Sequence, residues 1–99
     1  MPSMNPEDSL QNKTSLAPYK IAVSRYIRST MVLKNVKYED LADALAGKGV
    51  KLTASNLRNR VSKGLFSADM FILILEVLEH TENALEDIIR QASSAKPPM

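Results

Sequence analysis

A nearly continuous apolar segment, MFILILEVL from Met70 to Leu78, places the strongest restriction on how this chain folds. Glu76 is its single charged residue, so a helix built from the segment is apolar on almost every side. With Ser67 as its N-cap and an end near Glu79, this helix is too short to cross a bilayer, which takes about 20 residues. The segment therefore predicts a centrally buried helix that other helices surround.

Apolar residues at helical spacing predict four further helices and no strand. Their expected positions are roughly Pro18–Lys34, Tyr38–Gly47, a helix from the N-cap Thr53 to the stop Gly64, and a helix from the cap Thr81 to about Ala92. The inward residues of the first two are expected to be Val23, Tyr26, Ile27, Thr30 and Met31, with Leu33 near the edge, and then Leu41, Ala42 and Leu45. A chain of 99 residues makes one small domain, so the predicted fold is all-α, a compact bundle of four to five short helices.

The expected helix starts share a local pattern, in which an apolar residue before the cap packs on a residue of the first turns. The pairs are Leu16/Ile21, Val36/Leu41, Leu52/Leu57 and Phe66/Phe71. Ala17 and Lys37 are poor N-caps because they lack a good side-chain acceptor, and Asn35 is a plausible left-handed stop. Residues 1–15 are predicted to be a flexible arm, residues 16–92 the helical domain and residues 93–99 a flexible tail.

The composition argues against most catalytic and metal-binding classes. The chain has no cysteine and a single histidine, His80, and it contains no HExxH, P-loop or GxGxxG motif. His80 is expected to cap or pack where the fourth helix ends, and the acidic residues nearby are expected on exposed faces. We therefore expect no enzyme, no metal and no cofactor. The absence of cysteine fits a reducing, intracellular setting, and the N-terminal sequence lacks the order of a signal peptide, so we expect a cytoplasmic protein that is associated with the nucleoid when bound to DNA.

The charges divide the chain into two halves. Residues 19–66 hold ten Lys or Arg and three Asp or Glu, a net charge of +7. Residues 67–91 hold one Arg and six Asp or Glu, a net charge of −5. A basic half of this kind predicts a polyanionic partner, and the helix between Thr53 and Gly64 belongs to it.

The stretch TASNLRNRVSKG, from Thr53 to Gly64, has the pattern of a surface helix with polar and basic side chains on its outer side. Leu57 and Val61 are four residues apart and form the inward face. The outward residues are Ser55, Asn56, Asn59, Ser62 and Lys63, with Arg58 and Arg60 on the flanks. Such a set can read base edges between phosphates, and it is equally typical of a solvated polar face.

The segment from Tyr38 to Leu78 resembles the lambda-repressor-like helix-turn-helix superfamily. The shared order is a helix with Leu41 and Ala42 near its start, a glycine-bearing turn, a polar helix and then an apolar helix. The string LADAL…NLRNRVSKGLFSA more closely resembles a family of short bacterial proteins of uncharacterised function. The resemblance covers about residues 21–79.

This resemblance implies that the helix after Thr53 enters the major groove of DNA. It implies that Thr53, Ser55, Asn56, Asn59 and Lys63 face DNA and that Tyr38 approaches a phosphate. Ala42 and Leu57 are 15 residues apart, whereas a tight helix-turn-helix leaves roughly ten. The extra residues in GKGVKL either lengthen the second helix or form a looser turn.

The leading functional expectation is a small transcriptional regulator that binds double-stranded DNA sequence-specifically. Phosphates are expected to be neutralised by Arg25, Arg28, Arg58, Arg60 and Lys63. Asn56 and Asn59 suit adenine, and Arg58 or Arg60 suits guanine. The charge pattern also fits structured RNA, although the groove argument favours DNA.

The alternative is a helical protein-interaction module, antitoxin-like or an adaptor, that uses the acidic C-terminal half. The last helix carries Leu85, Ile88, Ile89 and Ala92 on one face. Leu85, Ile88 and Ile89 either cover the domain's own core or form the seam of a homodimer. A dimer would double the contacts to DNA, so the two functions are compatible.

Overall fold

The computed structural model describes residues 6–78 and 84–95, and these residues form five α-helices and no strand. The helices are α1 (Pro6–Lys34), α2 (Tyr38–Gly47), α3 (Ala54–Lys63), α4 (Ala68–Val77) and α5 (Ala84–Ala95). The all-α prediction is therefore confirmed. The expected cap Thr81 and the histidine His80 lie outside the described residues.

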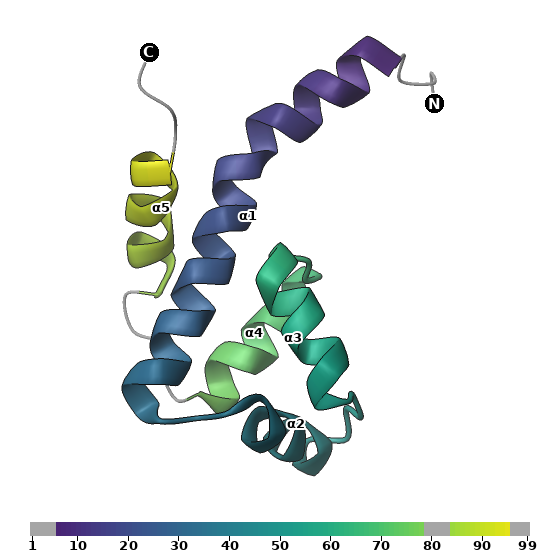
Figure 1. Cartoon of the computed structure of the whole chain (residues 1–99), viewed down its shortest axis with the longest axis vertical. Helices are drawn as coiled ribbons and strands as arrows, with labels where there is room; N and C mark the ends of the chain where they lie inside the picture. The colour runs from purple at the N-terminus through teal and green to yellow at the C-terminus, as the bar shows by residue number, and fades with distance from the viewer. Residues whose placement is uncertain (1–5, 79–83, 96–99) are drawn as a thin grey trace.

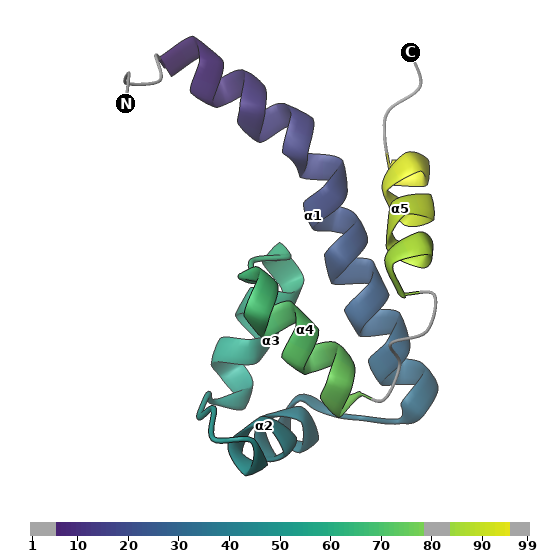
Figure 2. The same ribbon diagram turned by 180° about the vertical axis from the view of Figure 1, so that it is seen from behind.

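The long helix α1 is the central element, because two separate apolar clusters use it. Ile27 and Met31 of α1 pack with the buried residues Leu41, Leu45, Leu57, Val61, Ile74 and Leu78. On another side, Ala22 and Tyr26 pack with Ile88 and Ala92 of α5. Figures 1 and 2 show α5 alongside the second half of α1, with α2, α3 and α4 grouped on the other side. Most expected inward residues are confirmed, but Leu33 is 76% exposed.

The predicted start of the first helix was wrong. α1 begins at Pro6, so residues 6–15 are helical instead of forming a flexible arm, and Pro18 lies inside the helix. Leu16 and Ala17 are therefore helical residues, and neither precedes a helix start as expected. The side chains of residues 8–17 are exposed, so no inward apolar pattern marked this part as helix. It continues from a part of α1 that is already packed, which removes the cost of nucleating a separate helix.

The projecting part of α1 gives the molecule an elongated outline. Figures 1 and 2 show this part leaving the other helices and bending away from the packed half. A proline inside a helix removes one hydrogen bond and commonly bends the helix, and Pro18 lies inside α1. The radius of gyration is 15.0 Å, whereas a compact chain of this size has about 13 Å.

The prediction of central burial for α4 was also wrong. Ile74 is the buried residue of α4, and Leu78, the residue that follows the helix, is also buried. Ile72 is 63% exposed. Other apolar side chains of α4, such as Phe71, Leu73 and Leu75, are half-buried against the two clusters, whereas the side that carries Ile72 and Glu76 is exposed. Its N-cap position is Ser67 as expected, although the Ser67 hydroxyl donates to the Asp69 carboxylate. That bond and the Met70 N–H hold the pKa of Asp69 below its ordinary value.

Three helices end in the same left-handed motif. Asn35 (φ 55°), Gly49 (φ 90°) and Gly64 (φ 62°) have positive φ. Each is followed by an apolar residue whose N–H bonds five residues back: Val36 to Met31, Val50 to Leu45 and Leu65 to Arg60, at 2.8–3.0 Å. This pattern is the Schellman motif. The expected stops at Asn35 and Gly64 are confirmed, whereas α5 continues to Ala95 and takes in part of the predicted tail.

The end of α3 lies directly against the backbone of α1. A Cβ atom at Gly64 would overlap the backbone carbonyl oxygen of Lys20. One turn further along α1, the buried Ser24 hydroxyl donates to the Ser62 carbonyl of α3 at 3.4 Å. Glycine at position 64 therefore provides both the left-handed turn and the room that α1 needs.

We expect Gly64→Ala to destabilise the protein by more than about 2 kcal/mol, because it adds a backbone clash to the unfavourable positive φ. Gly49→Ala is the matched control, since Gly49 also has a positive φ but has open space around it. This control should cost about 1 kcal/mol. Urea unfolding followed by circular dichroism measures both, and equal losses would contradict the close contact between α1 and α3.

Candidate nucleic-acid interface

Helix α3 presents one face to the core and a polar face to solvent, as the sequence predicts. Leu57 and Val61 are each 0% exposed. The exposed side chains are Ser55, Asn56, Arg58, Asn59, Ser62 and Lys63, and Arg60 is half-buried. The hydroxyl oxygen of Thr53 accepts a hydrogen bond from the Asn56 N–H at 3.0 Å, which confirms Thr53 as the N-cap. This side-chain oxygen is therefore engaged in ordering the first turn of α3.

Two candidate base-reading residues of α3 bind each other. The Nε of Arg60 donates to the Oδ1 of Asn56 at 2.8 Å. An asparagine that binds adenine uses its amide oxygen and its NH₂ group together. The bond from Arg60 engages the amide oxygen of Asn56 and leaves its NH₂ group available. Within the described part of the chain, no residue hydrogen-bonds to the side chain of Asn59. Asn59 is therefore the asparagine of this face whose amide is open to a partner from outside the described residues.

Arg58 is directed toward the start of α2. Its guanidinium carbon lies 5.2 Å from the centre of the Tyr38 ring, the geometry of a cation–π contact. Both residues border a cleft of about 360 Å³, which we call the Arg28–Arg58 cleft. Its lining residues are Arg28, Met31, Val32, Val36, Lys37, Tyr38, Glu39 and Arg58. Arg28 of α1 and Arg58 of α3 thus share one depression although they are far apart in the sequence.

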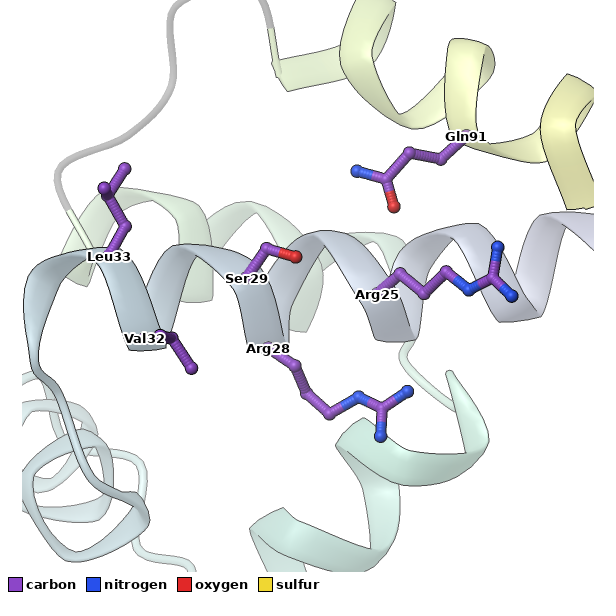
Figure 3. Close-up of a pocket in the computed structure, with 6 residues that line it drawn as sticks. All are labelled: Arg25, Arg28, Ser29, Val32, Leu33 and Gln91. Atoms are coloured by element: carbon purple, nitrogen blue, oxygen red, sulfur yellow. The ribbon is translucent and has the colours of Figure 1, made fainter.

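A second depression, of about 630 Å³, continues from this cleft along α1 toward α5. It is bordered by Arg25, Arg28, Ser29, Val32, Leu33 and Gln91 (Figure 3). In Figure 3 the side chain of Arg28 extends away from α5, whereas Gln91 points from α5 toward α1. Because Arg28 borders both depressions, the two depressions are neighbours, and we call the exposed arginines that line them, Arg25, Arg28 and Arg58, the basic surface.

The connection between α2 and α3 is a loop of six residues, 48–53. α2 ends at Gly47 as predicted, so the extra residues form a looser turn and do not lengthen the helix. The half-buried side chains of Val50 and Leu52 pack on the core, and the Lys48 ammonium pairs with the Glu76 carboxylate at 2.9 Å. The turn of a tight helix-turn-helix has 3–4 residues, so α2 and α3 are joined by a longer and anchored turn.

The sequence interpretation missed three features of this surface. Lys37 and Glu39, which line the Arg28–Arg58 cleft, were not among the expected site residues. The bond between Asn56 and Arg60 was missed as well, although a spacing of four residues brings side chains together on a helix. The proximity of Arg28 to Arg58 has no signal in the sequence, because it depends on how α1 and α3 pack.

Other site types find little support in the described ranges 6–78 and 84–95. No three His, Cys, Asp or Glu side chains there gather as metal ligands would. No helix in those ranges has both the length and the apolar content to cross a membrane.

Residues 19–83 match a protein family described as a domain of unknown function, DUF6471. The chain belongs to this family. The DUF6471 match starts where α1 begins to pack and leaves out its projecting part and all of α5. No curated protein and no solved structure matches the chain.

The contact between Arg58 and Tyr38 should be measurable as a coupling energy. In a double-mutant cycle of Arg58→Gln, Tyr38→Leu and both together, we expect a coupling of about 0.5–1 kcal/mol, because an exposed cation–π contact has this strength. Urea unfolding of the four proteins gives the value. Arg25→Gln paired with Tyr38→Leu is the control and should be additive. Additivity for Arg58 and Tyr38 would show that the stacked arrangement is not populated.

Proposed function

We propose that this protein binds double-stranded DNA sequence-specifically as a small transcriptional regulator, with α3 in the major groove. In this proposal α2 and α3 act as a helix-turn-helix with a long turn. The observation that carries it is the position of the exposed polar face of α3 beside the basic surface of Arg25, Arg28 and Arg58. DNA recognition requires contacts to base edges and contacts to phosphates. The polar face of α3 can supply the first kind and the neighbouring arginines the second.

The phosphate contacts follow from the distribution of charge. The segment 19–66, with its net charge of +7, covers the packed half of α1 and all of α2 and α3. The segment 67–91, with its net charge of −5, includes α4 and the first part of α5. This division orients the molecule with α1 and α3 toward a polyanion. Arg25, Arg28, Arg58 and Lys63 then neutralise phosphates, and Tyr38 approaches one through its position beside Arg58. Each neutralised phosphate releases counterions, so affinity falls as salt rises.

The base contacts fall to the middle of α3. Asn59 is assigned to adenine, because its amide has no hydrogen-bonding partner among the described residues. Asn56 and Arg60 act as a bonded unit, in which the Arg60 guanidinium keeps further N–H donors for a guanine or a phosphate. Ser55 and Lys63 flank these residues on the exposed side, and Thr53 orders the helix start.

DNA binding is tested by fluorescence anisotropy with labelled duplexes between about 50 and 200 mM salt. Contacts to several phosphates predict a loss of affinity of at least about a hundredfold over this range. Arg28→Gln should weaken binding to every duplex and reduce the salt slope by about one, because it removes one phosphate contact. Lys13→Gln, on the projecting part of α1, is the matched control and should change neither.

Sequence preference is tested separately with Asn59→Ala on a target selected from random duplexes. This variant should lose about 1–3 kcal/mol on the selected site and little on random DNA. The absence of binding to any duplex at low salt would refute the proposed function. Equal losses on selected and random DNA would refute the role of Asn59 alone.

The exposed side of α5 favours a second function, self-association or protein interaction. Leu85 is 68% exposed and Ile89 is 53% exposed, whereas Ile88 is 6% exposed and packs on α1. The expected seam of three residues is therefore divided: Ile88 covers the domain's own core, and Leu85 with Ile89 remains for a partner. A second copy of the chain is the partner we propose here.

We expect the double variant Leu85→Asp, Ile89→Asp to remain folded and to be a monomer, because both side chains are exposed. Ile88→Asp is the contrasting variant and should destabilise the domain, since it places a charge in the contact with α1. Light scattering gives the mass and thermal unfolding gives the stability. A wild-type protein that is already monomeric at about 200 μM would contradict the seam.

A further inference from the structure

The Arg28–Arg58 cleft combines positive charge with an apolar floor. Arg28, Lys37 and Arg58 bring three cationic side chains to its border, and Glu39 brings one carboxylate. Met31, Val32 and Val36 supply aliphatic surface between them, and Tyr38 supplies an aromatic ring. A phosphate on a DNA backbone uses the cations but has no use for the aliphatic surface.

The size and shape of the cleft suit a small organic molecule. Its volume of about 360 Å³ lies in the lower part of the range of ligand pockets, about 300–1,000 Å³. Met31 is buried and Val36 is half-buried, so core packing sets the positions of these two side chains, whereas Val32 is 81% exposed and forms the outer part of the apolar surface. Arg58 is held in place by the Tyr38 ring, so its cation is partly ordered before any ligand arrives.

We propose that this cleft binds a small apolar monocarboxylate, whose carboxylate pairs with Arg28 and Arg58 and whose apolar group covers Met31, Val32 and Val36. Guanidinium groups hold carboxylates through paired, charge-assisted hydrogen bonds. An aromatic or branched aliphatic group fills the remaining volume and removes apolar surface from water. Glu39 also lines the cleft, and its carboxylate repels the ligand's charge and so limits the affinity.

The direct test uses benzoate as the probe on the full-length protein without DNA. Isothermal titration calorimetry should show saturable binding with a Kd on the order of 1–10 mM, as expected for so few atoms. Benzamide, the neutral isostere, and acetate, which lacks the apolar group, should each bind at least about tenfold more weakly. Equal binding of benzamide would refute the carboxylate contact, and equal binding of acetate would refute the apolar floor.

Variants locate the site. Arg28→Gln and Arg58→Gln should each weaken benzoate binding about tenfold, because each removes one partner of the carboxylate. Glu39→Gln should tighten it several-fold, because it removes a like charge from the border. Lys13→Gln and Asp43→Asn are the matched controls, since both residues are exposed and neither lines the cleft. Unchanged binding in Arg28→Gln and Arg58→Gln, with unaltered melting temperatures, would overturn the proposal.

A regulatory consequence rests on the proposed function. Arg28 and Arg58 cannot hold a carboxylate and a DNA phosphate at once, so saturating benzoate should weaken DNA binding about tenfold relative to the same concentration of chloride. Benzoate binding without any DNA binding would refute the proposed function and leave the ligand site standing. DNA binding that benzoate does not alter, together with no heat of benzoate binding, would refute the ligand site alone.

Discussion

The contact between the end of α3 and the backbone of α1 determines where the rest of the surface lies. Because Gly64 has no side chain, the Lys20 carbonyl can lie against it, and the buried Ser24 hydroxyl bonds α3 one turn away. The close backbone approach at Gly64 and the hydrogen bond from the Ser24 side chain together hold the distance and the rotation of α3 relative to α1. That rotation turns Leu57 and Val61 into the core and brings Arg58 to the same cleft as Arg28. One close backbone approach and one hydrogen bond, neither of which involves an arginine, thus set the geometry of the basic surface.

α1 connects this surface with the acidic end of the molecule. One side of α1 completes the core with α2, α3 and α4, and another side holds α5 through Ala22 and Tyr26. Its remaining exposed side carries Arg25 and Arg28 between the two packed sides. The division of charge along the sequence becomes only partly a division in space. Arg25 and Arg28 lie on the exposed side of α1, whereas Asp69 and Glu76 belong to α4, which packs beside α2 and α3, and Glu86 and Asp87 belong to α5.

Local rules predicted what depends on near neighbours in the sequence. Thr53 and Gly64 bound α3, and Asn35 ends α1 in the left-handed conformation, because caps depend on the conformation of one or two residues. Two predictions failed where tertiary packing decides. The start of α1 was placed at Pro18, although helix propagation from the packed part continues back to Pro6. The predicted burial of α4 was too high. An apolar sequence indicates that a helix is stabilised by burial, but it does not indicate how many other helices pack against it.

The contacts of the arginines in the candidate site also could not be predicted from the sequence. Sequence reasoning identified Arg58 and Arg60 as flanking cations but not what each one contacts. In the structure Arg60 is bonded to Asn56 and Arg58 lies over Tyr38, so neither side chain is a freely moving charge. Ordering these side chains in the free protein lowers the entropy lost when they bind an anion. Under the proposed function, the same contacts would be kept or exchanged when DNA or a carboxylate binds, so the stacking of Arg58 on Tyr38 would link the start of α2 to the anion binding proposed for α3.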